Sequence, residues 1–151
     1  MTSPAQSPEV RVRRAREADI PQLAGLCGQL GYPSSVEEVS GRLKGIAAAP
    51  EHAVFVAEMI DGTLAGFLSA FVMRTLESDA HVEVGALVVD AQQRSRRVGE
   101  VLMKHAEDWA RENGCALVRL RSNVIRDAAH RFYERLGYEH YKTQKAFRKN
   151  L

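Results

Sequence analysis

The feature that most constrains the fold is a hydrophobic strand that passes through an arginine-rich turn into a helix, within residues 87–102. Arg94, Arg96 and Arg97 lie in the turn, and Gly99 lies in the first turn of the helix. A helix begins with backbone N–H groups that have no acceptor inside the helix, and its dipole is positive at that end. Together with guanidinium charges, these groups form a receptor for phosphate. The segment therefore predicts a β–turn–α unit that holds a phosphorylated ligand.

Apolar runs predict strands along the whole chain. They lie at residues 10–15, 53–59, 64–73, 81–89 and 116–120, with one or two further strands within residues 138–148. The Asp61-Gly62 pair is a strong hairpin signal, so the second and third strands should be antiparallel. Four segments between the strands have helical spacing and helix-end signals.

The first helix follows Asp19 as N-cap and stops at Gly31, and the second opens at the capping boxes of Ser34 and Ser35. Two more helices are expected at residues 98–112 and 126–136. The order is β-αα-β-β-β-α-β-α-β. This order predicts a three-layer α/β (α+β) fold, with a mixed, mostly antiparallel sheet flanked by helices.

Length and composition indicate one globular domain. The chain has 151 residues, of which 45% are hydrophobic and 26% charged. Residues 1–8 form a Pro/Ser-rich tail that is expected to be disordered, and residues 9–151 the single domain. No apolar run approaches the ~20 residues that span a bilayer. Cys27 and Cys115 match no metal spacing. Two free thiols, no metal, no membrane contact and a cytoplasmic location are therefore expected.

The net charge of +2 hides an asymmetry. Residues 1–90 carry 7 Lys/Arg against 12 Asp/Glu, whereas residues 91–151 carry 14 against 7. The basic half begins at the arginine turn, which favours an anionic ligand there. The acidic half would suit a cationic second ligand. Arginines on solvated helix faces could give the same distribution of charge without any ligand.

Two motifs resemble the GCN5-related N-acetyltransferases. Residues 94–99, RSRRVG, resemble the pyrophosphate motif Gln/Arg-x-x-Gly-x-Gly/Ala, although Arg97 replaces its middle glycine. Residues 129–138, AHRFYERLGY, resemble the late helix and turn of the family, Ala-x-x-(Phe/Leu)-Tyr-x-x-x-Gly-(Phe/Tyr). The element order agrees with that of the family from residue 10 to residue 147. If the Arg97 position requires a positive φ, arginine would strain it.

The resemblance implies acetyl transfer from acetyl-CoA, as cosubstrate, to an amine. It implies that the fourth strand pairs with the pantetheine arm, and that a backbone N–H near Val88 faces the thioester oxygen. The implied cofactor-binding residues are Leu87, Val88, Val89, Arg94, Ser95, Arg96, Arg97, Val98, Gly99, Glu100, Arg126 and Ala129. Many members carry an asparagine where this chain has Arg126. Asn123 lies three residues earlier, and either residue could substitute.

The resemblance also implies that Tyr133 protonates the departing thiolate, since a phenol near pKa 10 stays protonated at neutral pH. The alternative is a core aromatic with a satisfied hydroxyl. For the general base, family members often use a carboxylate on the fourth strand. Glu83 is the candidate here, and it shares a strand face with His81. The alternative is that either is an ordinary surface residue, the preferred interpretation for His81.

The function expected from these motifs is N-acetyl transfer to a primary amine of a small molecule or peptide, by direct attack in a ternary complex. A catalytically silent module that only binds acyl-CoA is the alternative. A nucleic-acid binder is a third, which ranks last because no aromatic-interleaved basic surface or helix-turn-helix pattern supports it. Family members often form homodimers, and this chain could do the same.

Overall fold

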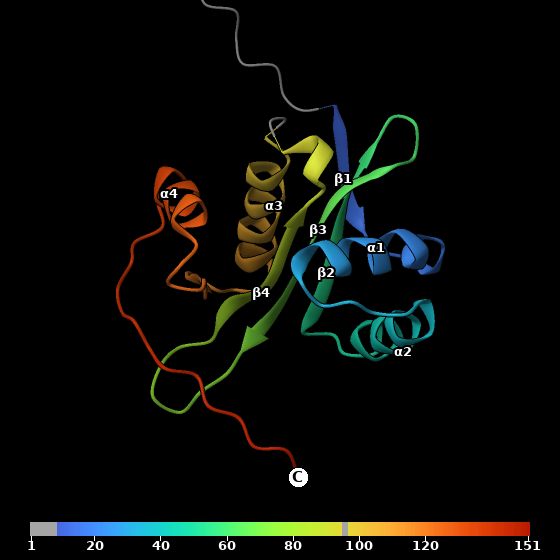
Figure 1. Cartoon of the computed structure of the whole chain (residues 1–151). Helices are drawn as coiled ribbons and strands as arrows, with labels where there is room; N and C mark the ends of the chain where they lie inside the picture. The colour runs from blue at the N-terminus through green and yellow to red at the C-terminus, as the bar shows by residue number, and fades with distance from the viewer. Residues whose placement is uncertain (1–8, 95–96) are drawn as a thin grey trace, which may run out of the picture. The chain divides into compact units, whose positions relative to one another are not determined.

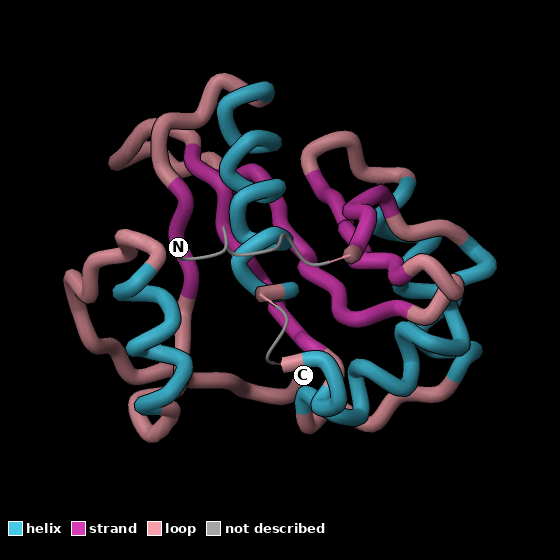
Figure 2. The backbone as a smooth tube through the Cα atoms, turned by 90° about the horizontal axis from the view of Figure 1, so that it is seen from above, coloured by secondary structure: helices cyan, strands magenta, loops and turns pink. Residues whose placement is uncertain are grey.

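The computed structural model describes residues 9–94 and 97–151. They form two compact units that divide after Leu120. The first unit holds a five-stranded sheet and three α-helices, and the second holds one helix and the C-terminal segment. Figure 1 labels most of these elements, and Figure 2 shows the backbone from above.

The sheet has the order β1-β2-β3-β4-β5. Its first four strands are antiparallel to their neighbours, and β5 pairs with β4 in parallel. The strands are β1 Val10–Arg14, β2 His52–Met59, β3 Leu64–Met73, β4 His81–Val89 and β5 Val118–Leu120. The mixed, mostly antiparallel sheet predicted from the sequence is therefore confirmed.

Helices cover both faces of this sheet, which makes three layers (Figure 1). The helices α1 Ile20–Leu30 and α2 Val36–Ala47 pack on one face, and α3 Val98–Glu112 packs on the other. Two short 3-10 turns complete the described elements: η1 Glu17–Asp19 precedes α1, and η2 Ala91–Gln93 follows β4. The core under α1 and α2 contains Leu23, Val56 and Val88. Under α3, Phe55 meets the ring of Trp109 edge-on.

The helix ends confirm two of the predicted signals and correct one. Gly31 ends α1 with φ +100°, and Ser35 with Glu38 forms the capping box of α2. Asp19 precedes α1 as predicted, but its side chain caps nothing there. Its carboxylate instead accepts from the Arg16 N–H and from both terminal nitrogens of Arg13, because an arginine fork binds a carboxylate more strongly than a single amide.

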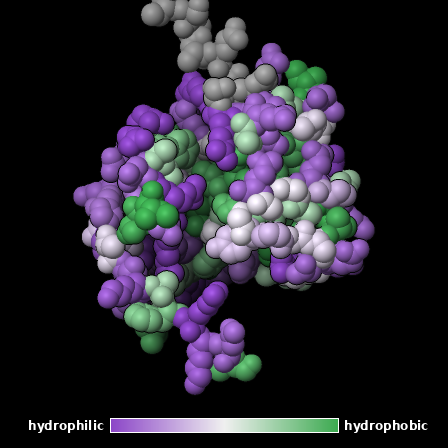
Figure 3. All heavy atoms as spheres, viewed as in Figure 1, coloured by the Kyte–Doolittle hydropathy of each residue, from purple (hydrophilic) through white to green (hydrophobic). Residues whose placement is uncertain are grey.

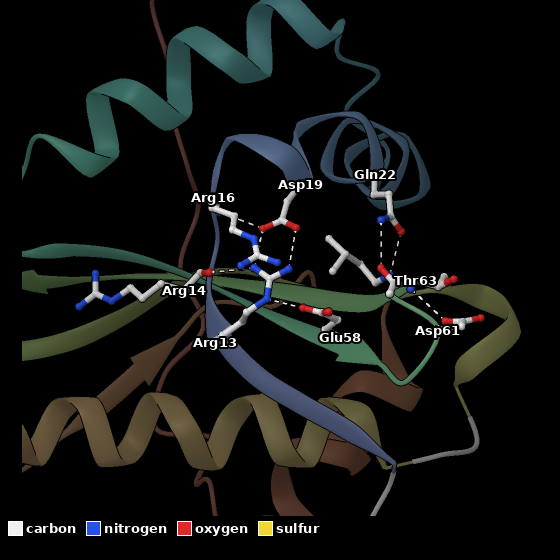
Figure 4. Close-up of polar contacts among 10 residues, drawn as sticks. Arg13, Arg14, Arg16, Asp19, Gln22, Glu58, Asp61 and Thr63 are labelled. Carbon is white, nitrogen blue, oxygen red and sulfur yellow. Dashed lines mark hydrogen bonds and ion pairs between the residues drawn. The ribbon is translucent and has the colours of Figure 1, made fainter.

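Polar contacts join the start of the chain to the sheet (Figure 4). The Arg13 guanidinium lies between Asp19 and Glu58, and so ties β1 to η1 and β2. Gln22 of α1 reaches the β2–β3 hairpin, where its Oε1 accepts from the Leu64 N–H at 2.8 Å. These bonds fix α1 over the face of the sheet.

The second unit contains α4 Asp127–Arg135 and a C-terminal segment. The prediction of one or two strands within residues 138–148 is wrong, because no residue from 136 to 151 lies in a strand. Lysines, arginine, histidine and glutamine interrupt the apolar residues of this segment, so it offers no continuous apolar face to a sheet.

The surface is largely polar. Hydrophilic side chains cover most of the face shown in Figure 3. Within the described ranges, no helix has the length and apolar character needed to cross a membrane. Both cysteines are free: Cys27 is half-buried and Cys115 is buried.

Candidate active site

The fourth strand is divided by a β-bulge at Gly85. The register pairs Ser69 with Ala86 and Ala70 with Val84, so Gly85 is an extra residue without a partner on β3. The pairing with β5 stops at the same place, because Val84 is the last residue of β4 that it reaches. Among the described residues, no strand pairs with that edge of β4 from Gly85 to Val89.

The backbone of this open edge presents hydrogen-bonding groups. The Asp90 N–H donates to the Ala65 carbonyl of β3 at 2.8 Å. Because hydrogen-bonded residues alternate along an antiparallel strand, the Val88 N–H also points to β3, whereas the N–H and C=O groups of Leu87 and Val89 point to the open edge. The structure therefore offers donors and acceptors for an extended ligand from Leu87 and Val89, on either side of Val88, near which the sequence analysis expects an N–H donor.

Gly66 brings β3 close to this part of β4. A Cβ on Gly66 would lie 2.4 Å from the Val88 carbonyl oxygen and 3.3 Å from the Val89 Cα. No side chain fits there without moving the backbone of β4. The sequence analysis did not single out Gly66, although a glycine inside a strand pattern is a known sign of close backbone approach.

The arginine turn joins this strand to α3. Ser95 and Arg96 lie outside the described residues, and Arg94 is exposed. Arg97 is the N-cap of α3, with φ +59° and ψ +22°. The position thus has a positive φ, the condition under which the sequence analysis expects strain, and arginine adopts this left-handed backbone at a cost of about 1–2 kcal/mol. Arg97 itself therefore has a glycine-like backbone conformation.

The Arg97 side chain folds back onto the first turn of α3. Its guanidinium donates to both carboxylate oxygens of Glu100, at 2.8 and 2.9 Å, and this pair raises the pKa of Arg97. The first helical bond nearby runs from the Val101 N–H to the Arg97 carbonyl at 3.2 Å. Val98 and Gly99, both buried, therefore start the helix at the end where its dipole favours an anion.

His81 and Glu83 meet on the α1/α2 face of the sheet. The His81 Nε2 lies 3.0 Å from the Glu83 Oε1, and the side chains are 2% and 8% exposed. The prediction that both share one strand face is confirmed. The preferred interpretation of His81 as a surface residue is wrong, because a period of two assigns a residue to a face but does not reveal whether helices cover that face.

Arg119 joins this pair from β5. Its Nε lies 3.6 Å from the Glu83 Oε1, and the parallel register places Arg119 beside Glu83. The sequence analysis missed Arg119, since only the pairing of β4 with β5 brings the two residues together. The site therefore has a carboxylate between an imidazole and a guanidinium.

The remaining predicted residues belong to the second unit. The Asn123 side chain accepts from the Ile125 N–H at 3.2 Å and the Asn123 carbonyl contacts the His130 ring at 2.8 Å, so Asn123 shapes the turn before α4. Arg126 is the exposed N-cap of α4, and Ala129 is half-buried on the helix.

Tyr133 lies on α4 beside two aromatic rings. Its ring centroid is 5.1 Å from that of Phe132 and 6.1 Å from that of Tyr138. Gly137, with φ +90°, lets the chain turn so that the Tyr138 N–H donates to the Tyr133 carbonyl. Burial raises the pKa of the Tyr133 phenol, and the charge of Arg126 partly opposes this. The phenol is therefore protonated at neutral pH.

The family of the chain follows from its match to a family model. Residues 20–138 match the model described as the acetyltransferase (GNAT) family. The chain belongs to this family. The match includes β4, the arginine turn and the helix of Tyr133.

Individual relatives agree with this assignment. The chain is 41% identical over 66 residues to the aminoalkylphosphonate N-acetyltransferase of Salmonella typhimurium, in a match that covers 42% of this chain and 43% of that protein. It is 36% identical over 88 residues to the streptothricin acetyltransferase of Streptomyces lavendulae, which covers 56% of this chain and 43% of the relative. The chain thus spans less than half the length of the relatives that it matches.

Solved structures share the fold. The glucosamine-6-phosphate N-acetyltransferase of Arabidopsis thaliana superposes with a TM-score of 0.82 at 22% identity, over 93% of this chain and 99% of that one. An aminoglycoside N-acetyltransferase in complex with CoA gives a TM-score of 0.83 at 21% identity, over 97% and 98% of the two chains. At these identities the likeness shows the fold alone.

Proposed function

We propose that this chain transfers the acetyl group of acetyl-CoA to a primary amine of a small molecule or peptide, by direct attack in a ternary complex. The open edge of β4 from Gly85 to Val89 carries the proposal, because it presents unpaired strand backbone next to the start of α3. Acetyl-CoA supplies an activated acyl thioester and a pyrophosphate. Family membership and the CoA complex of a structural neighbour support this choice of cosubstrate.

The residues that would hold acetyl-CoA fall into three groups. Leu87 and Val89 would pair with the extended arm through their outward backbone groups, on a strand that includes Val88. The N–H groups at the start of α3 and the arginines of the turn would bind the pyrophosphate. The proposed contacts of the turn and helix are Arg94, Ser95, Arg96, Arg97, Val98, Gly99 and Glu100, with Arg126 and Ala129 from the second unit.

Two side chains would move protons. Glu83 would accept a proton from the acceptor amine, because an amine attacks a carbonyl only through its free electron pair. Tyr133 would donate its phenolic proton to the thiolate that leaves. Its raised pKa keeps the proton available through the neutral range.

The acceptor is proposed to be a small amine. Several acidic side chains of the first unit are held in ion pairs: Asp19 and Glu58 with Arg13, Glu38 with Arg42, and Glu51 with Arg74. The arginines of these pairs are already counted among the 7 basic residues of residues 1–90, so the excess of acidic residues remains and supports a cationic acceptor. One relative is named for aminoalkylphosphonate and another for streptothricin, so the acceptor panel should contain both anionic and cationic amines. The free thiols of Cys27 and Cys115 fit the proposed cytoplasmic location.

Thiol release from acetyl-CoA in the presence of an amine panel tests this proposal. We expect turnover with at least one amine, double-reciprocal lines that intersect, and a loss of kcat in Tyr133→Phe of about 10²-fold or more. Tyr141→Phe, a change on an exposed C-terminal residue, is the matched control and should retain activity. Parallel lines would contradict direct attack. Acetyl-CoA binding without turnover of any amine would contradict the enzyme and favour a binding module.

A further inference from the structure

His81 and Glu83 form a buried, hydrogen-bonded pair, whereas a proton acceptor needs only a carboxylate. Both residues are more than nine-tenths buried, and they contact each other across one strand face. Glu83 Oε1 faces both the His81 Nε2 at 3.0 Å and the Arg119 Nε at 3.6 Å. Among the described residues, Glu83 makes its hydrogen bond and its ion pairs through Oε1, so one oxygen is held while Oε2 stays available.

The hydrogen-bond partners of the His81 ring indicate which of its nitrogens carries a proton. An ionised carboxylate can only accept, so the His81 Nε2 carries a hydrogen and donates it to Glu83. The His81 Nδ1 is buried, and no described residue offers it a partner. A second proton on Nδ1 would add both a charge and an N–H without an acceptor to this buried site. The hydrogen-bond partners therefore suit a ring with a proton on Nε2 and none on Nδ1.

We infer that His81 is a positioning residue that clamps Glu83 Oε1 through a neutral imidazole and thereby presents Oε2 to the acceptor amine. This inference rests on the proposed function. In the reaction, a proton leaves the amine nitrogen for Glu83 Oε2, and the nitrogen bonds to the acyl carbon. The carbon–sulfur bond then breaks with its electron pair on sulfur, and the thiolate that leaves takes the proton proposed to come from Tyr133. His81 keeps its own proton throughout.

The surroundings of the pair contain few other titratable groups. β5 contributes Arg119, and the β3 residues opposite the pair are Phe71 and Met73, which carry no charge. On β2, His52 stacks on Phe71 with ring centroids 5.4 Å apart. From α1, the thiol of Cys27 packs against the core on the same sheet face, and burial raises its pKa.

Two substitutions at His81 separate positioning from packing. Glutamine can still present an N–H donor near the Nε2 position, whereas leucine fills space without a donor. We expect His81→Leu to lower kcat by about 10-fold or more and to move the acid limb of kcat/KM to higher pH, because the buried carboxylate loses a donor. KM for acetyl-CoA should stay within about twofold. His81→Gln should restore most of kcat and return the acid limb towards that of the wild type.

His105→Gln is the matched control, since His105 lies on α3 and packs on Phe55 across the other sheet face. It should leave the acid limb unmoved. If His81→Leu and His81→Gln change melting temperature alike and neither moves the acid limb, His81 has only a structural role and the inference is overturned.

Imidazole ¹⁵N chemical shifts provide a readout that needs no turnover. The wild type should show His81 as the neutral tautomer protonated at Nε2, and Glu83→Gln should change that signal more than any other histidine signal. A tautomer protonated at Nδ1 would overturn the inference even in an active enzyme. If the protein acetylates no amine but His81 still shows the expected tautomer, the proposed function is wrong, whereas the contact between His81 and Glu83 is as inferred.

Discussion

At the scale of single residues, Arg97 has the only positive φ of a non-glycine among the described residues. We compare Arg97→Gly with Arg97→Ala, since both lose the exposed pair with Glu100 and differ in their tolerance of a left-handed backbone. The glycine variant should be more stable by about 0.5–1 kcal/mol, after the extra freedom of glycine in the unfolded chain is subtracted. Urea unfolding measures this difference. Equal stability of the two variants would show that φ is not positive here.

Asp19 makes the free energy of unfolding depend on pH in the acid range. Its hydrogen bond to Arg13 is the main reason that the pKa of Asp19 is lowered, and the Arg16 N–H adds to it. A lowered pKa means that the stabilisation is present above the unfolded value of about 3.9 and is lost as the pH falls through the folded value.

We expect Asp19→Asn to lower the free energy of unfolding at pH 7 by about 3 kcal/mol, since the variant breaks a buried ion pair. This value is at the lower end of the range for such pairs, because Arg13 keeps its contact with Glu58. The free energy of unfolding of this variant should also depend less on pH below 4 than that of the wild type. Urea titrations between pH 2.5 and 7 measure both effects. A variant with the same acid dependence as the wild type would contradict the role of Asp19.

At the scale of elements, the spacing of β3 and β4 depends on Gly66. Gly66→Ala would place a methyl group 2.4 Å from the Val88 carbonyl, so the two strands must separate. We expect a loss of about 1–3 kcal/mol of stability and weaker acetyl-CoA binding, measured by urea unfolding and calorimetry. Gly41→Ala is the control: it lies within α2 with no atom within 4 Å of the added carbon, and should gain up to about 1 kcal/mol. A Gly66→Ala variant as stable as the wild type would contradict the close approach.

Several elements were predictable because their signals are local. The Asp61-Gly62 turn, the Ser35–Glu38 capping box and the stop at Gly31 all depend on residues within one turn of each other. The sequence also identified Glu83 and its shared face with His81. Arg119 and Gly66 were not found, because each acts through a strand distant in sequence. The late strand was predicted from apolar spacing, which cannot tell whether a partner strand exists.

At the scale of the whole molecule, the two units differ in burial. The first contains fully buried side chains such as Leu64, Leu68 and Leu102, whereas α4 has no buried residue. We expect amides of α4 to exchange with solvent at least about 100-fold faster than those of β3, since stability follows buried contacts. Hydrogen exchange followed by mass spectrometry tests this expectation.

The same measurement with acetyl-CoA tests the proposed contacts of the second unit. A ligand at 100 times its Kd stabilises the native state by about 2.7 kcal/mol, so it should slow exchange in β3 and β4. If Arg126 and Ala129 contact the cosubstrate, α4 should slow as well. Unchanged exchange in α4 beside slower exchange in β4 would exclude both residues from the binding site.

The extra residue at Gly85 also sets the phase of the strand. Side chains alternate between faces, so odd and even positions should stay on opposite faces along β4. The bulge reverses this parity: odd-numbered Glu83 and even-numbered Val88 share the α1/α2 face. Deletion of Gly85 alone would remove the bulge and leave the remaining pairs with β3 in register, so His81 and Glu83 would stay on the same face as Val88. A strand shorter by this one residue, with every side chain kept, would thus change the bend of β4 at the site and leave the placement of its side chains on the two faces unchanged.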